Sequence, residues 1–63
     1  MPVFRLYFDQ LEMNVFAARF RALRAARELS RELAREVTVE GPKTRYIYAA
    51  GELDRFWYDM RRR

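Results

Sequence analysis

The first residues of the chain alternate between apolar and other side chains with a period of two. Phe4, Leu6 and Phe8 share one side of an extended segment over 3–8. This alternation predicts a strand with one apolar face, because successive side chains of a strand point to opposite sides.

A long amphipathic pattern follows this strand. Asp9 and Glu12 have the spacing of a capping box, which predicts a helix that begins at Gln10. Apolar residues then recur every three or four positions, and neither glycine nor proline interrupts the chain before Gly41. The pattern therefore predicts one helix over 10–36.

An alternative interpretation places a second strand over 11–17, in a hairpin with the first, and begins the helix near Ala18. Arg19, Arg21 and Arg24 would then lie near the positive end of the helix dipole. That position disfavours each cation by roughly 0.3–1 kcal/mol. The long helix is preferred on this ground.

The residue pattern of the C-terminal half predicts a β-hairpin followed by a short helix. β-Branched and aromatic residues over 37–40 and 45–50 flank the loop 41–44, a pattern typical of two antiparallel strands. Beyond Gly51, apolar residues recur with helical spacing at Leu53, Phe56, Trp57 and Met60. We therefore expect a single α+β domain over 1–63 in βαββα order: strand, long helix, β-hairpin and short C-terminal helix, with a small antiparallel sheet.

The alternation along the predicted strands assigns side chains to the two faces of this sheet. If Val39 and Ile47 face the long helix, Tyr46 and Tyr48 lie on the opposite face. We expect the short C-terminal helix to cover this aromatic face, because a large apolar cluster is rarely left exposed on a monomer. The alternative is a contact surface for a partner.

The predicted long helix exceeds its sheet in length. A helix over 10–36 spans about 40 Å, whereas a six-residue strand spans about 20 Å. The part of the helix that extends beyond the sheet would expose a wide apolar stripe. We therefore expect a homodimer in which the extending parts of the two helices pack on each other or on the partner's sheet. The hairpin alternative gives a shorter helix and needs no such partner. The residues expected to associate are Val15, Phe16, Phe20 and Leu23.

Composition narrows the chemistry that the chain can perform. It has neither cysteine nor histidine, which removes disulfides, thiolate ligands and the common near-neutral acid or base. The single serine, Ser30, therefore has no histidine to activate it. The loop 41–44 lacks the upstream glycine of a phosphate-binding loop. We expect no enzyme, no catalytic residue, no cofactor and no metal site.

Arginine is concentrated in the middle of the chain. The formal charge is +4, and residues 19–36 carry +3 of it. Arg19, Arg21 and Arg27 have no acidic residue three or four positions away, so this row repels itself unless an anionic partner meets it. An acidic protein surface or a phosphate backbone would fit. The expected partner-binding residues are Arg19, Arg21, Arg24, Arg27, Arg31, Tyr46, Tyr48 and Trp57.

In length and in its strand, helix, hairpin order over 3–50, the chain resembles small accessory proteins of bacteriophages. The resemblance implies binding to a host protein, since some of these proteins inhibit an enzyme such as RNA polymerase. We expect a regulatory or inhibitory protein-binding homodimer; the alternative is a small nucleic-acid-binding protein whose helix arginines contact phosphates. No apolar run approaches the roughly 18 residues that cross a membrane, so a cytoplasmic location without a membrane partner is expected.

Overall fold

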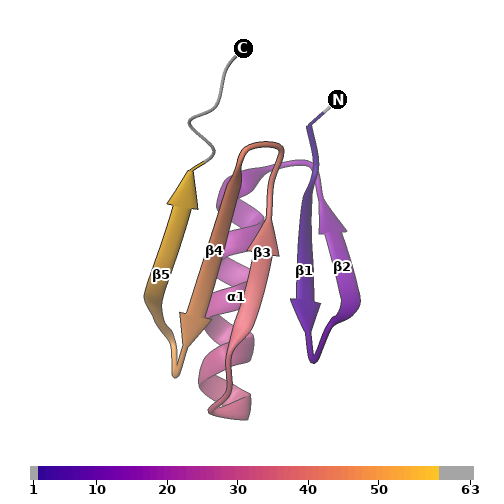
Figure 1. The fold of residues 1–63 in the computed structure, drawn as a ribbon. Coiled ribbons are helices and arrows are strands. Elements are labelled where there is room, and N and C mark those ends of the chain that lie inside the picture. The colour runs from indigo at the N-terminus through magenta and orange to yellow at the C-terminus, as the bar shows by residue number, and fades with distance from the viewer. Residues whose placement is uncertain (1, 59–63) are drawn as a thin grey trace.

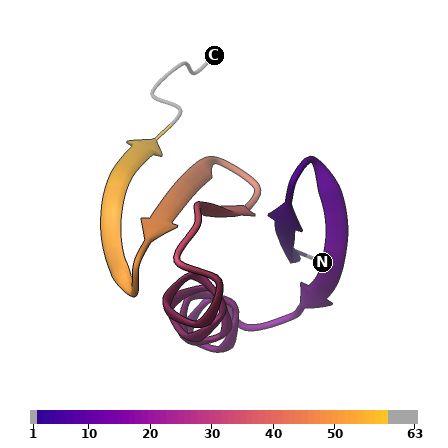
Figure 2. The ribbon, with the colours of Figure 1, turned by 90° about the horizontal axis from the view of Figure 1, so that it is seen from below.

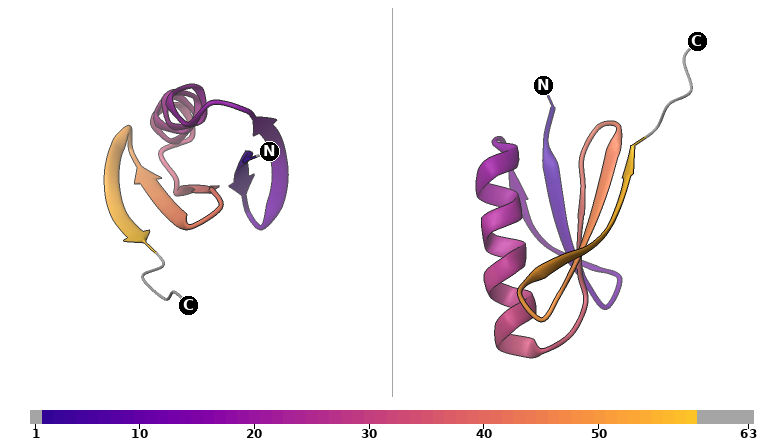
Figure 3. Two further views of the ribbon diagram at one scale, coloured as in Figure 1. Left: turned by 90° about the horizontal axis from the view of Figure 1, so that it is seen from above. Right: turned by 90° about the vertical axis from the view of Figure 1, so that its left-hand side faces the viewer.

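The computed structural model describes residues 2–58 and shows one helix packed on a five-stranded antiparallel sheet (Figure 1). Along the chain the elements are β1 (Phe4–Phe8), β2 (Leu11–Phe16), α1 (Arg19–Leu33), β3 (Val37–Glu40), β4 (Thr44–Ala49) and β5 (Glu52–Tyr58). The strand order across the sheet is β2-β1-β3-β4-β5. The sheet curves around the helix, which covers one of its faces (Figures 2 and 3). The prediction of an α+β fold with a small antiparallel sheet is confirmed.

The N-terminal segment forms a tight hairpin rather than the start of a long helix. Asp9 and Gln10 both have positive φ angles, 54° and 66°, and they connect the paired residues Phe8 and Leu11. Two-residue hairpin turns need such angles to match the twist of the strands. The predicted helix over 10–36 is therefore wrong, and the alternative with a second strand and a later helix is correct.

Small side chains allow α1 to lie close to the sheet. Ala22, Ala26 and Ser30 recur every four residues and are fully buried, so one narrow stripe of the helix meets the sheet. Opposite them, Val37 and Val39 of β3 are also fully buried. The core therefore lies between α1 and the centre of the sheet.

The pairing of β3 with β4 reverses one predicted face. Val39 lies opposite Tyr46, and directly opposed residues share a face. Tyr46 and Tyr48 are therefore in the core, at 7% and 6% exposure, while Ile47 lies on the opposite face beside Thr38. The prediction of Ile47 towards the helix and the two tyrosines away from it is wrong, because a shift of one residue in register exchanges the faces of a strand.

The segment after Gly51 is the edge strand β5, not a helix. Ala50 and Gly51 form a second two-residue turn with φ angles of 51° and 84°. The Phe56 ring then stacks against the buried Tyr46 ring, with centroids 5.0 Å apart. The predicted short helix is thus incorrect over the described part of this segment; Met60 lies outside the described residues. Within residues 2–58, no element covers the sheet face opposite α1.

Candidate interaction surfaces

α1 carries five arginines, which we call the helix arginines: Arg19, Arg21, Arg24, Arg27 and Arg31. All five are exposed. Within residues 2–58, four of them make no ion pair, and Arg24 only approaches Glu28, at 3.9 Å. The side chains of that pair are each about two-thirds exposed, so water screens the attraction strongly.

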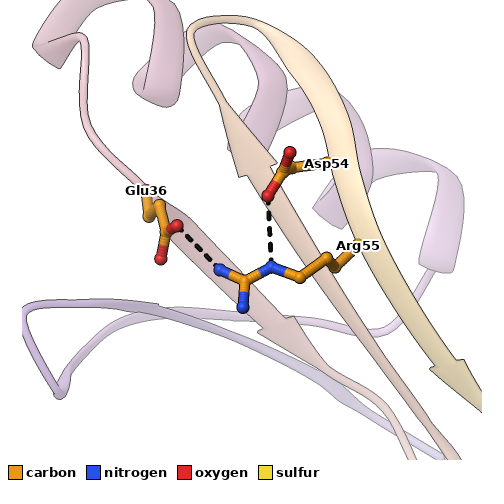
Figure 4. Close-up of polar contacts among 3 residues, drawn as sticks. All are labelled: Glu36, Asp54 and Arg55. Carbon is orange, nitrogen blue, oxygen red and sulfur yellow. Dashed lines mark hydrogen bonds and ion pairs between the residues drawn. The ribbon is translucent and has the colours of Figure 1, made fainter.

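The other arginines of the described chain are all ion-paired. Arg45 meets Glu40 across the β3–β4 hairpin at 2.7 Å. Arg55 reaches over the sheet to Glu36 at 2.7 Å and also contacts Asp54 at 3.1 Å (Figure 4). Two further pairs join Arg5 to Glu12 at 3.0 Å and Arg35 to Asp9 at 3.5 Å. These arginines are held by acidic residues of other elements or neighbouring positions, whereas no such ion pair holds Arg19, Arg21, Arg27 or Arg31 within the described residues.

The start of α1 is locally unfavourable for cations. Ala18 occupies the N-cap position without a side-chain hydrogen bond, and the first turn contains no acidic residue. Arg19 and Arg21 instead place positive charge beside the unpaired backbone N–H groups, where the helix dipole opposes it. Stability of the helix therefore does not explain these two arginines.

An exposed aromatic side chain lies among the helix arginines. Phe20 is 71% exposed, and the guanidinium of Arg24 lies 6.0 Å from the centroid of its ring. Leu23, one turn further along, packs partly against the core. The pair presents an exposed apolar ring beside a cation, and Trp, Tyr, Phe and Arg are the residues enriched at protein interfaces.

Acidic residues of α1 concentrate on a different flank. Glu28 and Glu32 line a hollow together with Met13 and Phe16 of β2. Arg31 lies beside the β4–β5 turn, where a Cβ added at Gly51 would come within 2.8 Å of its Nε atom. The helix thus directs acidic groups towards β2 and Arg31 towards β5.

Trp57 lies on the sheet face opposite the helix arginines. It pairs with Arg45 across the strands, and the guanidinium groups of Arg45 and Arg55 lie 5.8 Å and 5.9 Å from its ring centroid. Its side chain is 47% exposed. The structure therefore does not bring Trp57 together with the helix arginines, and it buries Tyr46 and Tyr48, so the predicted partner-binding residues do not form one surface.

The four residues predicted for self-association are also separated. Val15 lies on the open face of β2, opposite Arg5, whereas Phe16 packs against the core. Phe20 and Leu23 belong to α1, which at 15 residues is about 22 Å long and similar to its strands. The argument for a dimer from an overhanging helix therefore loses its basis.

A surface that the sequence interpretation missed is the outer edge of β5. Phe56, Trp57 and Tyr58 are adjacent and each is about half exposed. Three aromatic residues in a row after a glycine-containing turn are a strand signal. The helical spacing of Leu53, Phe56 and Trp57 concealed that signal.

Comparisons with protein-family models, curated proteins and solved structures found no significant match. Over the described residues, no helix is long and apolar enough to cross a membrane. No group of three or more potential metal ligands gathers there either. The geometry of the surfaces themselves is therefore the basis for a functional proposal.

Proposed function

We propose that the protein is a small regulatory binding module that docks the helix arginines and Phe20 on an acidic surface of another protein. One observation carries the proposal: the arginines of the sheet and loops are ion-paired, whereas four of the helix arginines have no acidic partner within residues 2–58. Charge that the fold leaves uncompensated on one side of a helix attracts an anionic surface.

The mixed chemistry of this surface favours a protein over a nucleic acid as the partner. Phe20 supplies an apolar anchor at 71% exposure, and a buried aromatic anchor with arginines around it is typical of protein hot spots.

The test compares two variants with the same change in net charge. The helix variant combines Arg21→Gln, Arg27→Gln and Arg31→Gln, and the control combines Arg5→Gln, Arg45→Gln and Arg55→Gln. A protein captured from lysate by the wild-type chain is purified, and its affinity is measured for all three proteins at several salt concentrations. We expect the helix variant to bind at least about tenfold more weakly, whereas the control keeps its affinity and loses at most about 1 kcal/mol of stability for each ion pair removed.

Two results would replace the proposal. Equal loss of affinity in both variants would mean that net charge, and not the helix arginines, attracts the partner. Retardation of mixed DNA and RNA in a gel at about 0.15 M salt, absent in the helix variant and present in the control, would instead assign the helix arginines to phosphates.

A further inference from the structure

The edge of the sheet formed by β5 is exposed and partly aromatic. Among the described residues, β5 has β4 as its only neighbouring strand, and all seven of its residues are exposed. Its outer edge therefore offers unpaired backbone N–H and C=O groups to another strand. Phe56, Trp57 and Tyr58 accompany them at 51%, 47% and 52% exposure.

Features that protect an edge occur only in the first half of β5. The register shift opposite Ile47 and Tyr48 leaves Asp54 as an extra residue, and Glu52 and Asp54 carry negative charges. The guanidinium of Arg55 instead lies over the Trp57 ring, 5.9 Å from its centroid. Bulges and charges oppose strand addition. No such feature occurs between Phe56 and Tyr58. The segment from Phe56 to Tyr58 lies at the end of β5 that is farther from Gly51, whose backbone N–H is hydrogen-bonded to α1.

The other edge of the sheet is better protected. β2 contains a register shift that leaves Met13 as an extra residue. Its polar residues Glu12 and Asn14 flank that position. The two edges therefore differ, and the aromatic half of β5 is the more suitable for pairing.

We propose that two copies of the chain associate through antiparallel pairing of their β5 strands, with Phe56 opposite Phe56 of the second copy. In this register Arg55 of each copy lies opposite Trp57 of the other. The strands pair over 55–57 in each copy, and the pairing ends before the extra residue Asp54. Phe56 shares the helix side of the sheet with Tyr46, whereas Arg55 and Trp57 lie on the opposite side. Each residue thus meets one from the same face, and a continuous ten-stranded sheet with two-fold symmetry results.

The chemistry of the strand is self-complementary in this register. Stacking of an arginine on Trp57 already occurs twice within one copy, at 5.8 Å and 5.9 Å, and the dimer would repeat it between copies. Asp54 and Arg55 cancel in charge, so the segment 54–58 does not repel its copy. This balance favours a second copy over a strongly charged partner.

The size of the interface sets the expected strength. Half of three aromatic side chains amounts to on the order of 300 Å² per copy, below the area of a standard permanent interface. The dimer is therefore weak and depends on concentration. Sedimentation equilibrium from about 10 µM to about 1 mM covers the dissociation constants of a weak dimer. We expect the mass to rise from 7.7 kDa towards twice that value.

Trapping with a single cysteine tests the pairing itself, since the chain has no cysteine of its own. Phe56→Cys places two thiols directly opposite each other at the symmetry axis, about 4.5–5.5 Å apart at Cβ, within reach of a disulfide after a small adjustment. Val15→Cys on β2 is the control. We expect Phe56→Cys to cross-link faster than Val15→Cys in a glutathione buffer.

A charge substitution tests the register. Trp57→Lys places a cation opposite Arg55 of the second copy, whereas Trp57→Glu places an anion there, and like charges opposite each other destabilise a strand pair. We expect the glutamate variant to dimerise at least about tenfold more tightly than the lysine variant. A monomer at the highest concentration, faster cross-linking of Val15→Cys, or equal behaviour of the two Trp57 variants would each overturn the proposal.

Discussion

The backbone N–H of Gly51 donates a hydrogen bond to Oγ of Ser30 at 2.9 Å, and the Ser30 hydroxyl donates in turn to the carbonyl oxygen of Arg27 at 3.0 Å. Both Gly51 and Ser30 are buried. This short chain of hydrogen bonds fastens the β4–β5 turn to α1, so the only serine of the protein has a structural role that the sequence interpretation did not assign.

Ser30→Ala is expected to destabilise the fold. It leaves the buried N–H of Gly51 without an acceptor, which costs about 1–3 kcal/mol. Denaturation in urea, followed by the fluorescence of Trp57, measures the free energy of unfolding. Glu52→Ala, next to the same turn but exposed, is the control and is expected to change it by less than about 0.5 kcal/mol. Equal losses in the two variants would show that the hydrogen bond contributes little.

Ala34→Gly is expected to stabilise the protein. Ala34 ends α1 in the left-handed conformation, with φ 55° and ψ 37°, which glycine adopts without the steric cost that alanine bears. We expect the free energy of unfolding to rise by about 0.5–1 kcal/mol, the relieved strain less the greater unfolded-state entropy of glycine, measured by thermal and urea denaturation. Ala25→Gly, inside the helix, makes the same chemical change and is expected to lower it by about 1 kcal/mol. A loss in both variants would contradict the conformational argument.

The sequence predicts an element of this fold correctly where one local pattern is present, and fails where the same residues fit both a helix start and a hairpin turn. Alternation located β1 and the β3–β4 hairpin correctly. Asp9 and Glu12 have the spacing of a capping box, yet Asp9 occupies a turn with positive φ and pairs with Arg35 at 3.5 Å. Only the pairing of β1 with β2 decides between these roles, and that pairing is a tertiary interaction.

The face of a strand is equally difficult to derive from one sequence. Ile47 is more apolar than its tyrosine neighbours, yet the register of the hairpin turns Tyr46 and Tyr48 inward. Their rings suit a core in which the helix presents only small residues such as Ala22 and Ala26.

The sequence likewise predicts only part of the candidate site. The lack of an acidic partner at Arg19, Arg21 and Arg27 follows from spacing along a helix and was predicted, because the spacing of three and four residues is local information. Arg31 has Glu28 at that spacing but makes no ion pair within the described residues. The edge of β5 depends on which strands lie at the border of the sheet, so it could be found only in the structure.

The ion pair between Arg55 and Glu36 is expected to contribute little to stability. Both side chains are about half exposed, and such pairs contribute about 0–1 kcal/mol. A double-mutant cycle with Arg55→Gln and Glu36→Gln measures the coupling, which should decrease with added salt. Arg27→Gln is the control for loss of an arginine without a described partner and is expected to leave stability unchanged. A coupling well above 1 kcal/mol would contradict the expected screening.

Reversal of charge along α1 is expected to separate stability from binding. Arg21→Glu places an anion near the helix N-terminus and should stabilise the fold by roughly 0.3–1 kcal/mol, whereas Arg31→Glu in the last turn should destabilise it by a similar amount. Both effects should shrink in about 1 M salt, where the screening length is about 3 Å. Denaturation at low and high salt measures them.

Both substitutions are nevertheless expected to weaken binding to an acidic partner, because each removes one of the helix arginines. Arg21→Glu should therefore give a more stable protein that binds less well. This opposition would explain cations at a position that the helix dipole disfavours. A stabilised Arg21→Glu variant that keeps its full affinity would remove Arg21 from the proposed contact surface and leave its position without a functional explanation.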